Sequence, residues 1–313
     1  MAPVVDVHVH LSETPELGLW SKSAYEIWEY GEKHDVRWSE ATGVVDDLRA
    51  RLGDGGVDHA VVVNATSVDE LRGRWFDGID VVWDGSRIVP AGDASLSLGD
   101  RLIAFNRWLV SSVADDDRIT PFVAVDPWML GTAELIDHLS EMAARGARGV
   151  KLHPPDQRCF PNDPRLLAVW RACVGLDLTV LSHSGSTRGP HRFADPEVFG
   201  DVLREVPDLR LVVAHLGGGE WEQVPALADA FPHVVFDLSE IIAWLGAPRA
   251  PDAEQMVRMI REIGVERVMF GSDYPWYDPS EMADVVSGLP GWSEQERSAI
   301  LGENAIRLLD LPI

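Results

Sequence analysis

Residues 147–185 read ARGVKLHPPDQRCFPNDPRLLAVWRACVGLDLTVLSHSG, and this stretch holds a complete strand–helix–strand unit. The segments Ala147–Pro154 and Asp177–Gly185 are rich in Val, Leu and other apolar residues, as are strands of a parallel sheet buried on both faces. Between them, Pro164–Gly175 begins with proline, a common residue in the first turn of a helix. The stretch therefore predicts one β/α unit followed by the next strand.

The same alternation fills the chain. The apolar runs are Val4–His10, His59–Ala65, Ile119–Pro127, Ala147–Pro154, Asp177–Gly185, Leu209–Gly218, His233–Ser239 and Val265–Pro275. Further helices are predicted over Thr132–Arg145, Pro196–Glu205, Asp252–Ile263 and Glu294–Leu309. Eight strand–helix alternations predict a (β/α)8 TIM barrel, formed by residues 1–313 as a single domain. A doubly wound open sheet is the alternative, although such sheets more often have about five or six strands.

Two intervals are longer than ordinary connections. Leu11–Asp58 follows the first predicted strand and Thr66–Arg118 follows the second, and both contain several tryptophans. Long loops in a compact domain are usually lids or small insertions. We expect loop insertions at these two places, with aromatic side chains that either pack on the barrel or line its mouth.

The composition excludes several classes of function. Of the 313 residues, 27 are Lys or Arg and 51 are Asp or Glu, so the formal net charge is −24. A surface this acidic repels nucleic acid and anionic membranes, and we expect neither as a partner. A small molecule remains the expected partner, because a local cationic centre can outweigh a distant field.

The compartment is also suggested by the sequence. Cys159 and Cys173 are the two cysteines and form no disulfide framework. Neither a basic, apolar leader nor a stretch of about 20 apolar residues is present. These features predict a cytoplasmic protein.

Ionisable residues interrupt the apolar runs at positions that should otherwise be apolar. Asp6, His8 and His10 alternate along the first run and so point to one face. Two imidazoles at i and i+2 favour a divalent cation, and Asp6 could hydrogen-bond one of them or be a structural carboxylate. Later runs end in Lys151, His153, His183, His215 and Asp273. Because all strands of a barrel end at the same mouth, we expect these residues to converge there.

Five short motifs, spread over nearly the whole chain, resemble those of a known family. The motifs are DVHVH at the first strand, SH at the fifth, AHLGGG at the sixth, FGSDYPW at the eighth and a closing GENAIRLL. In this order they resemble the amidohydrolase superfamily, and within it the amidohydrolase-related group that includes aminocarboxymuconate semialdehyde decarboxylase and its hydrolase relatives. Relatives in this group are often dimers, so the resemblance implies a possible homodimer.

The resemblance also implies roles for individual residues. His8, His10, His183 and Asp273 would be metal ligands. Asp273 would also take a proton from a bound water, and His215 would assist that water or polarise a substrate carbonyl. Imidazoles and one carboxylate suit Zn²⁺, with Mn²⁺ as an alternative, and such a cation can lower the pKa of bound water to about 7.

The fourth strand departs from the decarboxylases of the group, which carry a glutamine there. This chain has GVKLHP, which is closer to the hydrolase and lactonase side. Lys151 could be carboxylated and bridge two metal ions, could anchor a substrate carboxylate, or could form an ion pair with Asp273 or Glu240. His153 could contact substrate or metal.

Other polar or aromatic residues near the strand ends are candidates for substrate contacts. Asn64, Arg188 and Trp276 are expected to bind substrate, together with Lys151 and His153. The resulting hypothesis is a metal-dependent hydrolase that cleaves an amide, lactone or related C–N or C–O bond of a small, carboxylated or cyclic substrate. The alternatives are a metal-dependent non-oxidative decarboxylase of a small aromatic or unsaturated acid, and a barrel that binds a ligand without catalysis.

Overall fold

The predicted barrel is confirmed by a computed structural model, which describes residues 3–19, 21–22, 38–53, 56–66, 81–83, 88–90, 98–185 and 192–313. A parallel eight-stranded sheet follows the order of the chain. Its strands are β1 (Val5–Val9), β2 (His59–Val63), β5 (Ile119–Ala124), β6 (Gly149–Leu152), β7 (Thr179–Ser182), β8 (Leu211–Val213), β9 (Val235–Asp237) and β10 (Val268–Met269). Each lies within one of the eight predicted apolar runs.

Backbone hydrogen bonds bring the last strand back to the first. Val7 N–H donates to the Phe270 carbonyl at 3.0 Å, and Asp273 N–H donates to the His8 carbonyl at 2.9 Å. A further bond joins His10 N–H to the Tyr274 carbonyl at 2.7 Å. The segment that carries Asp273 is therefore tied directly to the strand that carries His8 and His10.

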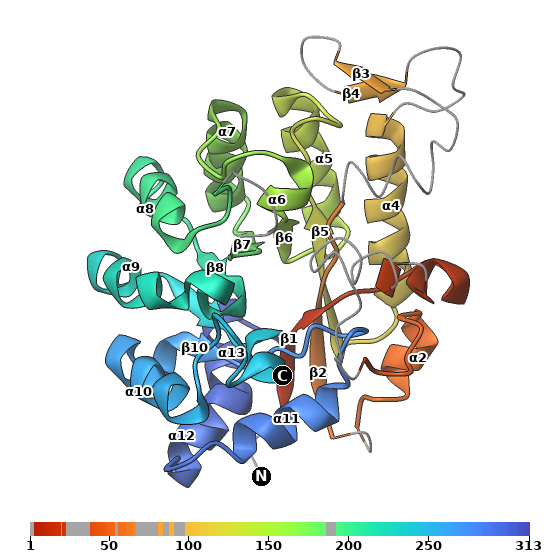
Figure 1. The fold of residues 1–313 in the computed structure, drawn as a ribbon. Coiled ribbons are helices and arrows are strands. Elements are labelled where there is room, and N and C mark those ends of the chain that lie inside the picture. Colours follow the sequence, from red (N-terminus) through yellow and green to blue (C-terminus); the bar gives the residue numbers. More distant parts are fainter. Residues whose placement is uncertain are drawn as a thin grey trace.

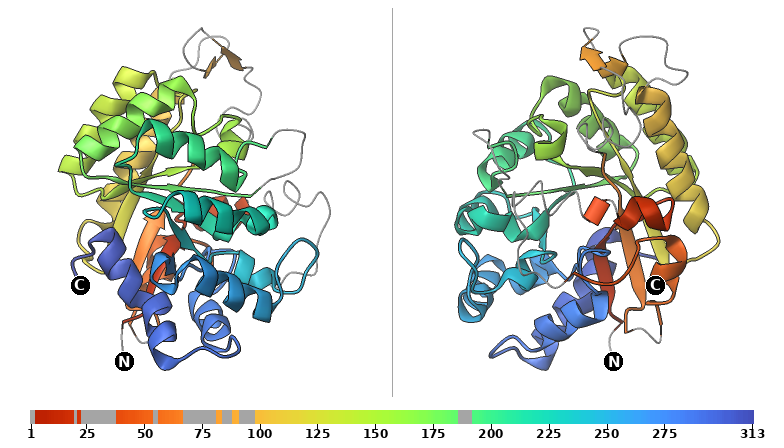
Figure 2. Two further views of the ribbon diagram at one scale, coloured as in Figure 1. Left: turned by 90° about the vertical axis from the view of Figure 1, so that its left-hand side faces the viewer. Right: turned by 45° about the vertical axis from the view of Figure 1, so that its right-hand side comes forward.

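Helices surround the sheet and connect successive strands (Figure 1). They are α2 (Val45–Arg49), α4 (Leu98–Val113), α5 (Thr132–Ala144), α6 (Pro154–Gln157), α7 (Pro164–Gly175), α8 (Pro196–Glu205), α9 (Val224–Ala230), α10 (Ala253–Ile263), α11 (Pro279–Ser287), α12 (Glu294–Ser298) and α13 (Asn304–Leu309). Figure 2 shows from two other sides that these helices form an outer layer around the strands. The predicted helix over Glu294–Leu309 is interrupted by a π-helical turn at Ala299–Glu303, between α12 and α13.

The alternation along β6 illustrates how the barrel separates its core from its site. Val150 and Leu152 are fully buried in the apolar layer between the sheet and the helices. Burying such a side chain contributes about 1.5–3 kcal/mol. Lys151, between them on the other face, is only 1% exposed and lies inside the barrel. The apolar positions thus fix the register that places the lysine inside.

The two long intervals contain small additional elements. The first includes α2, and the second includes α4 and an antiparallel hairpin of β3 (Val81–Trp83) and β4 (Ile88–Pro90). The hairpin lies beyond one end of α4, outside the barrel (Figure 1). The predicted insertions after the first two barrel strands are confirmed.

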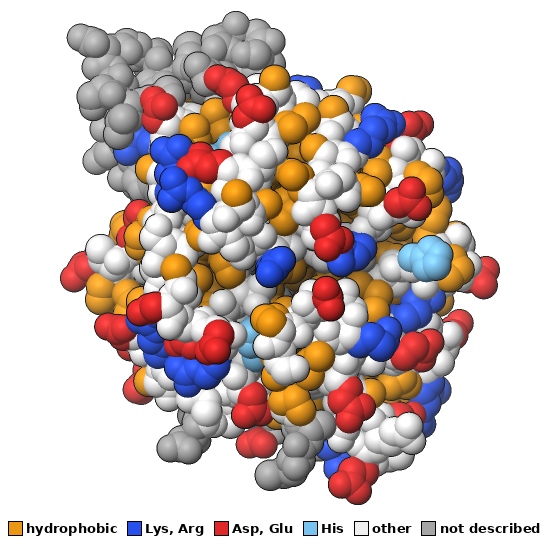
Figure 3. Space-filling view, turned by 180° about the vertical axis from the view of Figure 1, so that it is seen from behind, with side chains coloured by type: hydrophobic (Ala, Val, Ile, Leu, Met, Phe, Trp, Pro, Cys, Tyr) orange, Lys and Arg blue, Asp and Glu red, His pale blue; other side chains and the backbone are white. Residues whose placement is uncertain are grey.

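The surface carries charges of both signs. On the face seen in Figure 3, acidic and basic side chains are interspersed rather than gathered by sign. Within the described part of the chain, every helix is too short or too polar to cross a lipid bilayer.

Candidate metal centre

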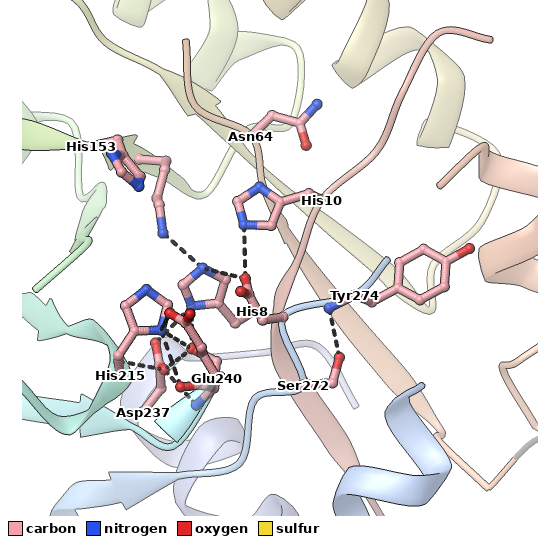
Figure 4. A network of polar contacts seen from close by, with 12 residues as sticks. His8, His10, Asn64, His153, His215, Asp237, Glu240, Ser272 and Tyr274 are labelled. Carbon is pink, nitrogen blue, oxygen red and sulfur yellow. Dashed lines mark hydrogen bonds and ion pairs between the residues drawn. The ribbon is translucent and has the colours of Figure 1, made fainter. Parts of the chain in front are cut away.

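The first strand places two histidines inside the barrel. His8 is completely buried, and the side chain of His10 is 17% exposed at the end of the strand. Their ring centroids are 5.1 Å apart. The predicted common orientation of the two imidazoles follows from the alternation of side chains along β1 (Figure 4).

Asp273 approaches both histidines from the segment after β10. Its Oδ1 lies 3.2 Å from His10 Nε2 and 3.5 Å from His8 Nε2. In the segment after β10, the backbone of Asp273 has φ of 65°, which is a left-handed conformation. Gly271 allows the close approach, since a Cβ there would lie 2.9 Å from the His8 Cβ.

These three residues have the donor atoms that a divalent cation needs. One ligand atom each from His8, His10 and Asp273 lie within 4.8 Å of one another. Burial lowers the pKa of His8 well below its usual value, so the imidazole is neutral at pH 7 and can offer a lone pair. Two imidazole nitrogens and a carboxylate suit Zn²⁺ or Mn²⁺ better than a hard cation such as Ca²⁺. The donor set fits a metal site.

A row of imidazoles extends from this set across the barrel mouth. The His215 ring lies 4.9 Å from the His8 ring and 4.6 Å from the His183 ring, and the His183 ring lies 4.1 Å from that of His153. Burial lowers the pKa of His183 to about 3 and lowers that of His215 well below normal. His183 is therefore in the mouth as expected. It belongs to neither of the two groups of donor atoms within 4.8 Å of one another that the described residues form, which are His8, His10 and Asp273, and His8, His215 and Asp237.

Lys151 is the cation of the site. Its Nζ lies 2.8 Å from His8 Nε2, on the side of the ring that faces Asp273. Burial lowers the pKa of this lysine, while the charges of Asp237 and Asp273 oppose the shift. The same burial raises the pKa of Asp273, and the Lys151 charge opposes it. The lysine amine and Asp273 Oδ1 thus both approach the same nitrogen, His8 Nε2, at 2.8 and 3.5 Å.

Two residues at and just after the end of strand β9, Asp237 and Ser239, were not singled out from the sequence. Asp237 Oδ2 lies 3.0 Å from His8 Nδ1, and the Ser239 hydroxyl lies 2.9 Å from both His8 Nδ1 and His215 Nδ1 (Figure 4). The motif FDLS contained the signal, because polar residues two apart in a buried strand point to the same interior face.

Of the two roles expected for Asp6, the structure shows that of a structural carboxylate. Its carboxylate accepts hydrogen bonds from the backbone of His8 and from both the N–H and the hydroxyl of Ser272. Burial raises the pKa of Asp6 to about 7. Asp6 therefore joins β1 to the segment that follows β10, and the carboxylate that contacts the His8 ring is Asp237.

The residues predicted to bind substrate, Asn64, Trp276, His153 and Arg188, differ in what they contact in the structure. The Asn64 side chain is used to hold the backbone of Leu11, accepting from its N–H at 2.8 Å and donating to its carbonyl at 2.9 Å. The Trp276 ring is perpendicular to the His10 ring at 5.3 Å and so forms part of the site wall. His153 Nδ1 lies 3.3 Å from Asp156. Arg188 lies outside the described residues.

Comparison with known proteins extends over the whole barrel. The sequence model of a family described as amidohydrolase matches residues 5–311, in agreement with the resemblance seen in the motifs. A search of curated proteins found no match.

Solved structures with the same fold are distant in sequence. A putative 2-pyrone-4,6-dicarboxylic acid hydrolase from Pseudomonas putida is 19% identical, with a TM-score of 0.60 over 100% of this chain and 99% of that one. A dihydroxybenzoic acid decarboxylase from Polaromonas sp. JS666, with bound manganese and the inhibitor 2-nitroresorcinol, is 16% identical, with a TM-score of 0.65 over 100% and 98%. A 2,6-dihydroxybenzoate decarboxylase from Rhizobium is also 16% identical, with a TM-score of 0.65 over 99% of both chains. At these identities the likeness shows the fold.

Proposed function

The chain belongs to the amidohydrolase family, and from this premise we propose that it is a metal-dependent, non-oxidative decarboxylase of a small aromatic or unsaturated carboxylic acid. The observation that carries the proposal is the Lys151 amine, buried 2.8 Å from His8 beside the His8, His10 and Asp273 donor set. A lysine and a divalent cation together would offset the carboxylates around them, Asp237 and Asp273 among them, and add local positive charge in a protein of net charge −24. Such local positive charge suits a carboxylate.

Two of the three solved relatives described above support decarboxylation over hydrolysis. Their names specify hydroxylated benzoic acids as substrates, and one of them holds manganese. The sequence had favoured hydrolysis because of the GVKLHP strand. Since the hydrolase relative has a similar fold, hydrolysis remains the second candidate. The observation that favours it is that the strand GVKLHP lacks the glutamine expected of the decarboxylases.

In the proposed reaction, the metal ligands, Lys151 and the proton donor have separate functions, and Asp273 has two of them. A divalent cation bound by His8, His10 and Asp273, with His183 as the further expected ligand, would stabilise negative charge on the substrate as a Lewis acid. Lys151 would hold the substrate carboxylate. The bond between the carboxyl carbon and the ring breaks, its electron pair stays on the ring carbon, and CO₂ leaves. Asp273, or a protonated His215, then donates a proton to that carbon.

Hydrolysis would use the same residues, but Asp273 would first accept a proton instead of donating one. Asp273 would accept a proton from the attacking water and return it to the leaving group, and His215 would stabilise the oxyanion. A barrel that only binds its ligand would show a tight complex and no product. The three readings therefore differ in what happens to the substrate atoms, and isotopes separate them.

The experiment is to incubate the Mn²⁺-loaded protein with a panel of hydroxybenzoates and of lactones in D₂O and, separately, in H₂¹⁸O. Decarboxylation gives CO₂ in equal amount to a product with one deuterium at the carbon that lost the carboxyl group. Incorporation of ¹⁸O into a ring-opened acid without CO₂ release would replace the proposal with the hydrolase. Binding without either product across the panel would favour the non-catalytic barrel.

Replacing Lys151 with Met distinguishes its three roles. If Lys151 anchors the substrate carboxylate, KM should rise about 10- to 100-fold, as expected for loss of a charged hydrogen bond of about 1.5–3 kcal/mol. Metal content should remain unchanged. A fall from two metal ions to one would instead identify a carboxylated, bridging lysine. A loss of thermal stability with neither kinetic nor metal change would leave only the ion-pair role.

A further inference from the structure

The end of strand β9 and the residues just after it place a carboxylate and a hydroxyl between two histidines of the site. Asp237 and Ser239 are both completely buried. Their side chains contact ring nitrogens of two histidines: Asp237 contacts His8 Nδ1 (Figure 4), and the Ser239 hydroxyl contacts the Nδ1 atoms of His8 and His215. The arrangement of hydrogens in this cluster can be deduced from which atoms are able to donate.

The Ser239 hydroxyl has one hydrogen, and that hydrogen has a clear destination. The Ser239 Oγ lies 2.5 Å from Asp237 Oδ1, a carboxylate oxygen that accepts and does not donate. With the hydrogen directed there, only oxygen lone pairs remain to face His8 Nδ1 and His215 Nδ1, each at 2.9 Å. Both ring nitrogens must therefore donate.

Each histidine has a second acceptor that requires the same tautomer. Asp237 Oδ2 lies 3.0 Å from His8 Nδ1, and the Ser239 carbonyl lies 3.1 Å from His215 Nδ1. On the opposite side of the His8 ring, the Lys151 amine is a donor 2.8 Å from Nε2. His8 thus has acceptors at Nδ1 and a donor at Nε2.

We propose that Asp237 and Ser239 are positioning residues that hold His8 and His215 as the Nδ1–H tautomer, so that both rings present an Nε2 lone pair to the mouth. For His8 this is the lone pair that a metal ion would use, and that consequence rests on the proposed metal role. For His215 it is the lone pair that can accept a proton or a substrate hydrogen bond. The nitrogen that carries the proton is set by the partner of the other nitrogen.

Replacing Asp237 with Asn provides a selective test, because the surroundings determine which way the amide points. Asp237 Oδ1 accepts hydrogen bonds from His215 N–H at 3.1 Å, Ser239 N–H at 3.0 Å and the Ser239 hydroxyl. Three donors hold the oxygen of an Asn side chain at that position. Its NH₂ group then faces His8 Nδ1 and donates to it, which moves the ring proton to Nε2, and the Lys151 amine must turn its hydrogens away from that nitrogen. His215, which keeps the Ser239 carbonyl, should not change.

The measurement is ¹⁵N NMR of the histidine rings in the metal-free protein, with signals assigned by replacing His8 and His215 one at a time. Wild type should show a protonated Nδ1 and an unprotonated Nε2 for both rings. Asp237→Asn should invert His8 alone and lower Mn²⁺ affinity about 10- to 100-fold, the usual effect of losing such a partner. Wild-type rings with Nε2 protonated, or an Asp237→Asn protein whose His8 is unchanged, would overturn the proposal.

Two matched variants separate this role from loss of charge or of packing. Asp6→Asn removes another fully buried carboxylate, which bonds to the backbone of His8 and not to its ring, so the tautomer should stay as in wild type. Ser239→Ala keeps Asp237 Oδ2 as the acceptor for His8 and the backbone carbonyl of residue 239 as the acceptor for His215. Neither histidine should therefore change its tautomer. Because the spectra need neither metal nor substrate, they decide this inference even if the proposed decarboxylation is wrong.

Discussion

Replacing Asp273 with Asn should reduce kcat about 10³-fold or more while leaving the barrel folded. A carboxyl group that transfers a proton contributes about 10²–10⁴-fold by that step alone, and an amide also binds a divalent cation more weakly. The change should not disturb the fold, because Asn is among the residues most tolerant of the positive φ of 65° found here. The bond from the backbone N–H to the His8 carbonyl is also kept. Steady-state kinetics and thermal unfolding measure the two effects.

Asp126→Asn is the control for this variant. Asp126 is also a buried carboxyl group whose pKa burial raises to about 7, but it bonds to the Trp128 N–H and the Thr66 hydroxyl and lies outside the donor set. Its replacement should lower stability and leave kcat within a few-fold of wild type. Normal turnover by Asp273→Asn would show that proton transfer at Asp273 is not part of the reaction.

Removing the metal should have the second largest effect. A protein treated with chelator should lose activity to background and regain it when Mn²⁺ or Zn²⁺ is added, because His8, His10 and Asp273 would lose the charge that they hold in common. Mg²⁺ and Ca²⁺ should restore little, since imidazole ligands are poor partners for hard cations. Metal analysis alongside the kinetics gives the number of ions per chain.

Metal binding should also stabilise the fold. At a free concentration about 100 times Kd, an ion that binds the native state contributes about 2.7 kcal/mol to the free energy of unfolding. The melting temperature of the metal-free protein should therefore rise on addition of Mn²⁺, and this rise should shrink in Asp273→Asn. Full activity after complete metal removal would instead indicate a metal-independent reaction carried out by Lys151, His215 and Asp273.

The sequence predicted the fold well because the signal is local. Each strand is a short apolar run, and Pro164–Gly175 and Pro196–Glu205 are helices with the predicted bounds. The convergence of His8, His10 and Asp273 followed from one further rule, that parallel strands of a barrel end at the same mouth. Neither the fold nor this convergence required knowledge of interatomic distances.

The pairing of polar groups inside the barrel could not be predicted in the same way. Asp6 is two residues from His8 and was the natural partner for its ring, yet Asp237, on a strand two positions away in the sheet, makes that contact. Which carboxylate reaches the imidazole depends on how far along the barrel axis each residue lies on its own strand. Likewise, nothing local to Asn64 indicates that its amide is fully used in holding Leu11.

Anomalous diffraction from crystals soaked in Mn²⁺ tests the metal centre most directly. We predict one strong peak bonded to the Nε2 atoms of His8 and His10 and to a carboxylate oxygen of Asp273, with the Lys151 amine displaced from its contact with His8. A protein that binds Mn²⁺ in solution but shows its peak elsewhere, with these three side chains unbonded to it, would contradict the proposed centre.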